Sequence, residues 1–396
     1  MTAAASPPTI AFYAPMKAPD HAVASGDRRM ARLLFAALAR AGFPPRLESR
    51  LRAYEPTGAD EAQDALTAAA EAETARLLAH YARAPGERPT LWFTYHSYYK
   101  AVDRIGPAVA RALSIPYCIA EASHAPRRAA GPFARAHAAN MAALAAADAL
   151  FVMTAHDRAM LERLPPGAPS DQTDSSDRIE KCSDGPALID LPPFIDHLPA
   201  TPAPRPPRAV PALLTVAMMR PGDKLESFRL LARALAQVGR PWRLTVAGDG
   251  EARAEVEALF AGLPGEVAFP GLVDDPAALA ALYVEADLLV WPAVNEAYGM
   301  VFLEAAAQGC PALAGDHGGV ASVVIDGETG VLVPPGDAPA FTAAFARALK
   351  SLIDDPARRA RLGAGARALV AGSRTLDGAA AILRAGLLPL VGSAAA

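Results

Sequence analysis

Two glutamates, Glu296 and Glu304, are the side chains whose placement says most about chemistry in this sequence. They lie within NEAYGMVFLEAAAQGCPALAGDHGG, residues 295–319, and a turn of small residues separates them. From Met300 onward, apolar residues recur at helical spacing, so a helix is predicted to begin there. The N-terminus of a helix offers free N–H groups and a partial positive charge, which suit a phosphate.

The two carboxylates flank that predicted helix N-terminus. Glu296 precedes the helix and Glu304 lies a turn or more inside it. One carboxylate is therefore placed to bind hydroxyls on one side of a diphosphate, and the other to bind hydroxyls on the opposite side. A nucleotide-sugar has this layout, because its diphosphate joins a ribose to a hexose. The alternative interpretation is a pair of surface helix carboxylates.

Two cations, Arg220 and Lys224, follow the strand predicted over residues 212–219. A departing diphosphate gains negative charge in the transition state, and paired cations stabilise that charge without a proton donor. Their position after a strand favours this role over that of solvated loop residues.

Length and periodicity predict two α/β domains. A chain of 396 residues is too long for one ordinary core. Strands alternate with helices, which indicates parallel sheets covered on both faces. The predicted strands are 9–15, 91–96, 116–122, 149–154 and 187–196 in the first half, and 212–219, 242–250, 266–270, 286–293, 311–315 and 330–335 in the second. Ligands bind beyond the carboxyl ends of such strands, so the loops there are expected to line an interdomain cleft.

Helices and connections complete this outline. Asp27 is predicted to cap a helix over 31–42. The polar segment 165–187 is expected to be an exposed loop. The proline-rich segment 198–211 is predicted to be a semi-rigid linker. The further predicted helices cover 59–83, 105–113, 132–147, 226–239, 251–261, 276–285 and 300–308.

Composition limits the classes of function. The net charge of −4 argues against a nucleic-acid partner. Cys118, Cys182 and Cys310 show no paired spacing, which argues against a disulfide framework or a metal site. Residues 1–8 lack a signal pattern, and the alanine-rich run 138–153 is too short and polar to span a bilayer. A soluble cytoplasmic protein is expected, with peripheral membrane contact left open.

The motifs around Glu296, Glu304, Arg220 and Lys224 resemble the donor site of retaining glycosyltransferases with the GT-B fold, in particular glycosyltransferase family 4. The resemblance is strong over residues 213–370 and weaker over 9–196. It implies two Rossmann-like domains facing across a cleft. An acceptor-side domain would cover 1–197 and a donor domain 212–374, and a C-terminal helix at about 375–396 could pack back onto the first.

The resemblance also implies the ligands. The donor would be a nucleotide-diphosphate sugar, with UDP or GDP most usual, and neither a cofactor nor a metal would be needed. The acceptor would be a glycan, a lipid-linked glycan or a small molecule. The base, the sugar and the acceptor are not readable from the sequence.

Residue by residue, the family's donor site maps onto this chain as follows. Arg220 and Lys224 would bind the diphosphate, Glu304 the ribose and Glu296 the hexose. Backbone N–H groups of Tyr298, Gly299, Met300 and Val301 would contact phosphates and sugar, while Phe269 and Gly271 would cradle the base. Gly248 belongs to a strand-end turn for which a structural role is favoured. For Gly26, contact with the diphosphate and an ordinary loop position are equally favoured interpretations.

Three side chains after strands of the first half compete for the reaction centre: His96, Glu121 and His124. The family often carries a histidine near the transferred sugar, and His124 or Glu121 would match it. A structural, hydrogen-bonded role is the alternative for either histidine. Tyr95, Tyr98 and Tyr99 would stack on an acceptor sugar or simply pack, and Arg127 and Arg128 would bind an anionic acceptor or be solvated.

The chain departs from the family pattern at Leu225, where glycine is frequent, and at Ser322, where glutamate is common. Neither departure touches the implied mechanism, in which the acceptor attacks from the face of the leaving group and the departing phosphate takes its proton. Two alternatives stay open: a GT-B nucleotide-sugar epimerase, and a catalytically silent nucleotide-sugar-binding protein.

Overall fold

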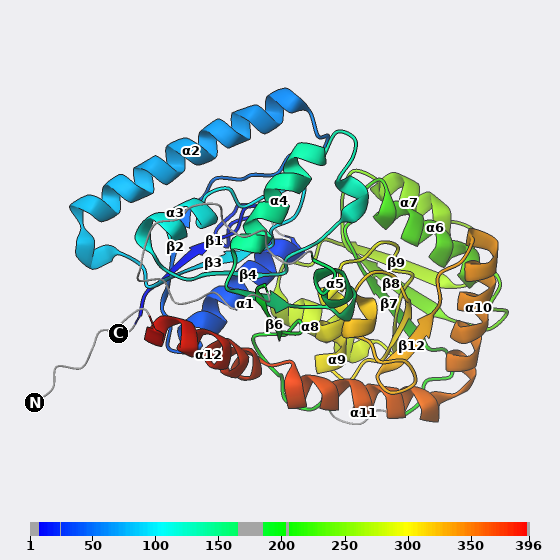
Figure 1. Ribbon diagram of the computed structural model, residues 1–396. Coiled ribbons are helices and arrows are strands. Elements are labelled where there is room, and N and C mark those ends of the chain that lie inside the picture. The colour runs from blue at the N-terminus through cyan, green and yellow to red at the C-terminus, as the bar shows by residue number, and fades with distance from the viewer. Residues whose placement is uncertain (1–7, 24, 165–184, 203–205, 394–396) are drawn as a thin grey trace, which may run out of the picture. The chain divides into compact units, whose positions relative to one another are not determined.

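The structure is a computed structural model that describes residues 8–23, 25–164, 185–202 and 206–393. It divides into two compact units, Met1–Pro192 with Leu376–Ala396, and Pro193–Thr375. Each unit is built on its own six-stranded sheet (Figure 1). Cys182 and most of the predicted loop 165–187 lie outside the described residues.

In the first unit the strands are β1 (Ile10–Tyr13), β2 (Pro45–Ser49), β3 (Leu91–Tyr95), β4 (Tyr117–Ala120), β5 (Ala149–Val152) and β6 (Ala187–Asp190). They run parallel in the order β2-β1-β3-β4-β5-β6. The helices are α1 (Gly26–Arg40), α2 (Asp60–Arg83), α3 (Gly106–Leu113), α4 (Ala134–Ala146), α5 (Ala155–Leu161) and α12 (Leu376–Ser393).

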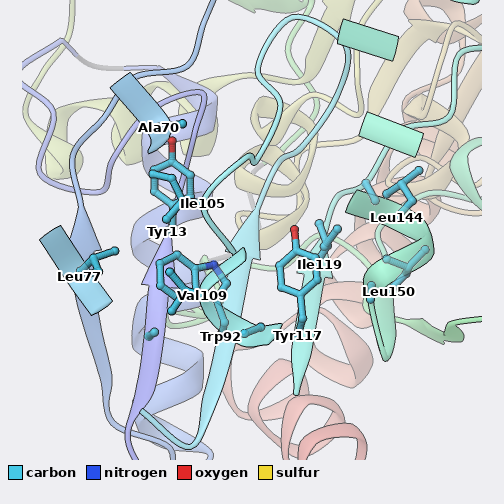
Figure 2. Packing of buried hydrophobic residues seen from close by; sticks show 14 of the residues in the cluster. Tyr13, Ala70, Leu77, Trp92, Ile105, Val109, Tyr117, Ile119, Leu144 and Leu150 are labelled. Carbon is cyan, nitrogen blue, oxygen red and sulfur yellow. The ribbon is translucent and has the colours of Figure 1, made fainter. Parts of the chain in front are cut away.

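In the four central strands of this sheet, side chains are buried on both faces, as expected of a parallel sheet between helices. One face sends Tyr13, Trp92 and Tyr117 from neighbouring strands toward α2, α3 and α4, and Figure 2 shows these rings beside Leu77 and Val109. The other face carries Phe12, Phe93 and Phe151. Phe12 packs against Phe35 of α1, and Phe151 lies beside Gly386 of α12.

The C-terminal helix α12 packs on α1, although the two are far apart in sequence (Figure 1). Arg384 donates a hydrogen bond of 3.0 Å to the carbonyl of Ala41, and Arg40 pairs with Asp377 at 2.7 Å. The chain thus returns to its first unit after completing the second.

In the second unit the strands are β7 (Ala212–Val216), β8 (Arg243–Ala247), β9 (Glu266–Gly271), β10 (Leu288–Trp291), β11 (Ala312–Gly315) and β12 (Gly330–Val333). They are parallel in the order β12-β11-β10-β7-β8-β9. The helices α6 (Asp223–Leu235), α7 (Arg253–Phe260) and α10 (Ala338–Asp354) pack together. So do α8 (Pro276–Glu285), α9 (Met300–Ala307) and α11 (Pro356–Ser373).

Several elements differ from the sequence prediction. The edge strand β2 is not among the predicted strands, because PRLES carries a single large apolar residue and is mostly half-buried. Ser25, rather than Asp27, caps α1: its side chain accepts a hydrogen bond from the N–H of Arg28, while Asp27 sits in the first turn. The strand predicted over 187–196 ends at Asp190. Helices α5, α10 and α11 are additions to the predicted set.

Among the helices within the described ranges, none combines the length and apolar character needed to cross a membrane.

Candidate functional site

The second sheet has one point where the direction of winding reverses. Strand β7 has β8 on one side and β10 on the other, so the loops after β7 and β10 leave the sheet in opposite directions. Open α/β sheets bind ligands beyond the carboxyl ends of the strands at such a reversal. Residues 217–222 follow β7 and residues 292–299 follow β10, and the predicted donor residues lie in or beside these segments.

Lys224 and Glu296 meet at this edge. The ammonium of Lys224 forms an ion pair with Oε2 of Glu296, and it lies 5.5 Å from the centre of the Trp291 ring. The indole N–H of Trp291 donates to the same Oε2 at 3.4 Å. The sequence predicts Lys224 in the loop after the strand. Helix α6 begins at Asp223, however, so Lys224 belongs to the first turn of that helix. Arg220 remains in that loop and is exposed.

The loop that carries Glu296 is fastened to the first turns of α6. The buried Ser227 hydroxyl accepts a hydrogen bond from the N–H of Val294 at 3.0 Å, and the amide of Asn295 donates to Asp223 at 3.0 Å. Ala293 and Asn295 have φ values of 57° and 51°, a strained region for residues other than glycine. These bonds hold the strained loop, and with it Glu296, in one conformation.

The glycine pair after β11 supports the same loop from the other side. A Cβ on Gly318 would lie 2.2 Å from the carbonyl oxygen of Glu296, and the N–H of Gly319 approaches that oxygen at 3.4 Å. Only glycine permits this approach of two backbones. Ser322, where the family often has glutamate, offers its carbonyl to Arg374 at 2.8 Å.

Glu304 is on α9, whose N-terminus follows Glu296. Its carboxylate accepts a 2.8 Å hydrogen bond from the hydroxyl of Tyr283 on α8. Gly299 precedes the helix with a φ of 78°, and Tyr298 and Met300 are buried, while Val301 is half-buried. The first turn of any α-helix leaves N–H groups without partners inside the helix. The two glutamates thus flank a helix N-terminus, as the spacing predicts.

The loop after β8 and the end of β9 contribute backbone to the same edge. Gly248 has a φ of 142°, and its N–H donates to the carbonyl of Gly271 at 2.8 Å. A Cβ at position 248 would lie 1.9 Å from the carbonyl oxygen of Ala217, which makes glycine a structural requirement there. Phe269 is half-buried, and its carbonyl accepts a 3.5 Å bond from Arg253.

The first sheet reverses its winding between β1 and β3, and a compact charged cluster lies beyond these strands. His96 and Glu121 directly follow Tyr95 and Ala120, which are paired in the register of β3 and β4. Nδ1 of His96 lies 3.0 Å from Oδ1 of Asp27 and 3.9 Å from Oε1 of Glu121. We call Asp27, His96 and Glu121 the acidic-histidine cluster. His96 and Glu121 have φ values of 62° and 55°, so both are held in a strained conformation.

Burial and mutual charge shift the titration of the acidic-histidine cluster. Burial disfavours a charged His96 ring, but Glu121 and Asp27 outweigh it and raise the pKa of His96 to about 9. Burial raises the pKa of Glu121 to about 7, although the nearby His96 opposes that rise. Burial also raises the pKa of Asp157 in the first turn of α5, whose N–H donates to the hydroxyl of the cap Thr154. The buried Lys17 contributes positive charge beside Asp27.

The raised pKa of His96 predicts that its ring loses the proton at a higher pH in the folded protein than in the unfolded chain. Its pKa in the folded protein lies above the usual value of about 6.5. The imidazolium therefore stabilises the fold fully below about pH 6.5, and that contribution is lost as pH rises through about 9. In an NMR titration assigned with His96→Gln, we expect a pKa well above 6.5 that falls in Asp27→Asn and in Glu121→Gln. An unshifted pKa in the wild type would contradict this electrostatic description.

His124 has different partners. Its Nδ1 lies 3.0 Å from the carbonyl oxygen of Met160 on α5, and its ring centre is 6.0 Å from that of His137 on α4. The structure thus brings His96 and Glu121 together, while these contacts of His124 are those of a structural hydrogen-bonded residue.

A chain of aromatic rings extends from His96. The His96 ring stacks on Tyr98 at 4.7 Å, Tyr98 meets Tyr99 at 5.4 Å, and Tyr99 meets Phe133 at 4.9 Å. The guanidinium of Arg128 lies 5.0 Å from the Tyr99 ring centre. Phe133 is buried, whereas the half-buried rings of Tyr98 and Tyr99 serve either as packing or as a stacking surface for a sugar.

Gly26 is the first residue of α1, directly after the cap Ser25. A Cβ added at Gly26 would meet no atom of the described residues within 4 Å. Packing within the protein therefore does not explain a glycine there, and the position leaves room for a ligand to approach the N-terminus of α1.

Sequence reasoning did not assign a site role to Trp291, Tyr283, Ser227 or Asp27. Each contacts a residue distant in sequence, which in the case of Trp291 is Lys224, and spacing does not reveal such contacts. Strand alternation could have pointed Trp291 toward α6, since it ends the buried run Leu288–Trp291. In the described part of the chain, no group of three or more His, Cys, Asp or Glu side chains is arranged to hold a metal ion.

Comparison with known proteins agrees with this geometry. Residues 210–354 match the model of the family described as glycosyl transferases group 1. The match covers most of the second unit, which contains Lys224, Glu296 and Glu304. This part of the chain is therefore similar to the group 1 glycosyltransferases.

Two curated relatives illustrate the range of similar proteins. An alpha-D-kanosaminyltransferase of Streptomyces kanamyceticus is 32% identical over 171 residues, which are 43% of this chain and 43% of the relative. A D-inositol 3-phosphate glycosyltransferase of Xylanimonas cellulosilytica is 39% identical over 148 residues, 35% of this chain and 34% of the relative. The chain thus spans less than half the length of these relatives.

Solved structures show similarity over nearly the whole chain. A sucrose-phosphate synthase from Thermosynechococcus elongatus has a TM-score of 0.70 at 23% identity, covering 98% of this chain and all of that one. The Anabaena protein HepE in complex with UDP has a TM-score of 0.67 at 15% identity, covering 96% and 100%. At these identities the likeness concerns the fold, and it confirms the predicted GT-B fold with its two Rossmann-like domains.

Proposed function

We propose that this protein is a retaining glycosyltransferase that moves a hexose from a nucleotide-diphosphate sugar to a hydroxyl of an acceptor. The observation that carries the proposal is the arrangement around α9. Glu296 and Glu304 flank the helix N-terminus, and Lys224 contacts Glu296 at the point where the sheet reverses its winding. The similarity to the group 1 glycosyltransferases and the complex of HepE with UDP-glucose support it.

Each group in the second unit has a proposed part. Glu304, oriented by Tyr283, binds the ribose hydroxyls, since an ionised carboxylate accepts two hydrogen bonds. Glu296 binds the hexose. Arg220, Lys224 and the N–H groups at the start of α9 bind the diphosphate and stabilise the charge that it gains on departure.

The proposed reaction needs no enzyme nucleophile. The bond between the anomeric carbon and the phosphate oxygen breaks, and a bond to the acceptor oxygen forms on the same face. The departing phosphate oxygen takes the proton of the acceptor hydroxyl, so charge and atoms balance.

The first unit is proposed to serve the acceptor. The acidic-histidine cluster offers a carboxylate and an imidazolium for hydroxyl groups, and the rings of Tyr98 and Tyr99 offer a stacking surface. Gly26 is proposed to lie against the diphosphate. The acceptor is proposed to be a glycan, a lipid-linked glycan or a small molecule, with peripheral membrane contact if it is lipid-linked.

Proton NMR of the reaction products tests the proposal. The protein is incubated with UDP-glucose, GDP-mannose and related donors, with water or added sugars as acceptors. We expect a released or transferred sugar that initially carries the anomeric configuration of the donor. Inversion would contradict the retaining mechanism. An epimerised nucleotide-sugar formed without any transfer would identify an epimerase, and unchanged donors throughout would favour a silent binding protein.

A further inference from the structure

Trp291 contacts both of the second unit's central charged residues, and no assigned role accounts for this. The face of its indole ring lies under the ammonium of Lys224, at 5.5 Å from the ring centre. The edge of the same ring, through its N–H, reaches Oε2 of Glu296 at 3.4 Å. A ring face attracts a cation and an indole N–H donates to an anion, so one side chain suits both partners.

The ring itself is held firmly. Trp291 is the last residue of β10 and only 1% exposed. Phe228 of α6 packs edge-to-face against it, with ring centres 5.0 Å apart and an interplanar angle of 70°. Phe228 in turn meets Phe260 of α7 at 6.4 Å. The ring orientation is therefore set by the core between β10, α6 and α7.

The two bonds to Glu296 end on the same carboxylate oxygen. Both the ammonium of Lys224 and the indole N–H of Trp291 contact Oε2. The other oxygen, Oε1, thus keeps its accepting capacity while the carboxylate is held at a fixed angle. A carboxylate fixed in this way can accept a hydrogen bond from a sugar hydroxyl without first changing its orientation.

From this geometry we infer that Trp291 is a positioning residue that orients Glu296 toward the transferred sugar and holds Lys224 beside the diphosphate. The inference rests on the proposed function, in which these two residues serve the donor. Trp291 itself would touch neither the donor nor the acceptor. Loss of the N–H alone is expected to lower kcat and to change the binding of the nucleotide much less, because Glu304, Lys224 and a ring beneath Lys224 all remain.

Trp291→Phe tests the inference, because it keeps a ring in the core but removes the N–H. Donor turnover is measured with UDP-glucose and GDP-mannose, and the dissociation constants of UDP and GDP are measured by calorimetry. We expect kcat to fall about tenfold, as for loss of a hydrogen bond to a charged group. The dissociation constant of the preferred nucleotide should stay within about twofold, because no nucleotide contact is removed. Trp291→Leu, which also removes the ring beneath Lys224, should lower kcat further.

Trp242→Phe is the matched control. Trp242 is 2% exposed in the same unit, and its indole N–H is buried without a hydrogen-bond partner among the described residues. Its replacement should leave kcat unchanged, while it lowers the melting temperature about as much as Trp291→Phe does. Unchanged kcat in Trp291→Phe would overturn the inference, and so would equal losses in both Phe variants. A wild-type protein that neither binds these nucleotides nor turns over a donor would instead overturn the proposed function.

Discussion

Lys224→Ala is expected to lower kcat roughly 10³-fold, the upper range for removing one group that stabilises developing negative charge. The departing diphosphate would lose one of its two proposed side-chain cations, the one in the first turn of α6. The change also leaves Glu296 without its ion-pair partner. The negative charge of its carboxylate would then repel the negatively charged diphosphate. Steady-state kinetics with the preferred donor provides the measurement.

Lys350→Ala is the control for this substitution. Lys350 lies in the same unit and forms a 2.8 Å ion pair with Asp354 on the exposed side of α10. Removing it takes away a lysine and an ion pair without touching the candidate site, and kcat should not change. If Lys224→Ala lost less than about threefold in kcat, the leaving-group role of Lys224 would be wrong.

Gly248→Ala is expected to lower the free energy of unfolding by about 4 kcal/mol, the sum of backbone strain and steric overlap. The new Cβ would lie 1.9 Å from the carbonyl oxygen of Ala217, and the φ of 142° is one that alanine rarely adopts. Folded proteins are stable by only about 5–15 kcal/mol, so this loss is large. Urea denaturation followed by circular dichroism gives the value.

Gly239→Ala separates the two contributions to that loss. Gly239 has a φ of 60°, but within the described part of the chain a Cβ there would meet no atom within 4 Å. It should cost only about 1 kcal/mol, from backbone strain alone. Equal and small losses in both variants would show that the loop after β7 moves away from β8 at little cost.

The sequence predicts the core of this fold well because parallel strands between helices are continuous apolar runs. Leu91–Tyr95, Leu288–Trp291 and the helix after Gly299 are confirmed in this way. Strand β2 is not predicted in this way, because an edge strand buries few side chains and so lacks a continuous apolar run. Helix α10 is a genuine omission, since Phe341, Phe345, Leu349 and Leu352 recur at helical spacing.

The site is predictable from sequence only where its residues share one local element. Glu296, Gly299 and Glu304 lie within one turn and one helix, so spacing alone places them around a helix N-terminus. The contacts of Lys224 with Glu296 and of His96 with Asp27 join residues 72 and 69 positions apart. Only the strand order brings such residues together, and no local pattern encodes that order.

The central claim is that the second unit binds a nucleotide-sugar through Glu304 and the N-terminus of α9. The most direct test is a thermal-shift screen of UDP, GDP, ADP and their common sugars on the wild type and on Glu304→Ala. We predict that one nucleotide selectively raises the melting temperature of the wild type and that Glu304→Ala loses this rise. If no nucleotide stabilised the wild type, or if the variant responded equally, the account of this site would be contradicted.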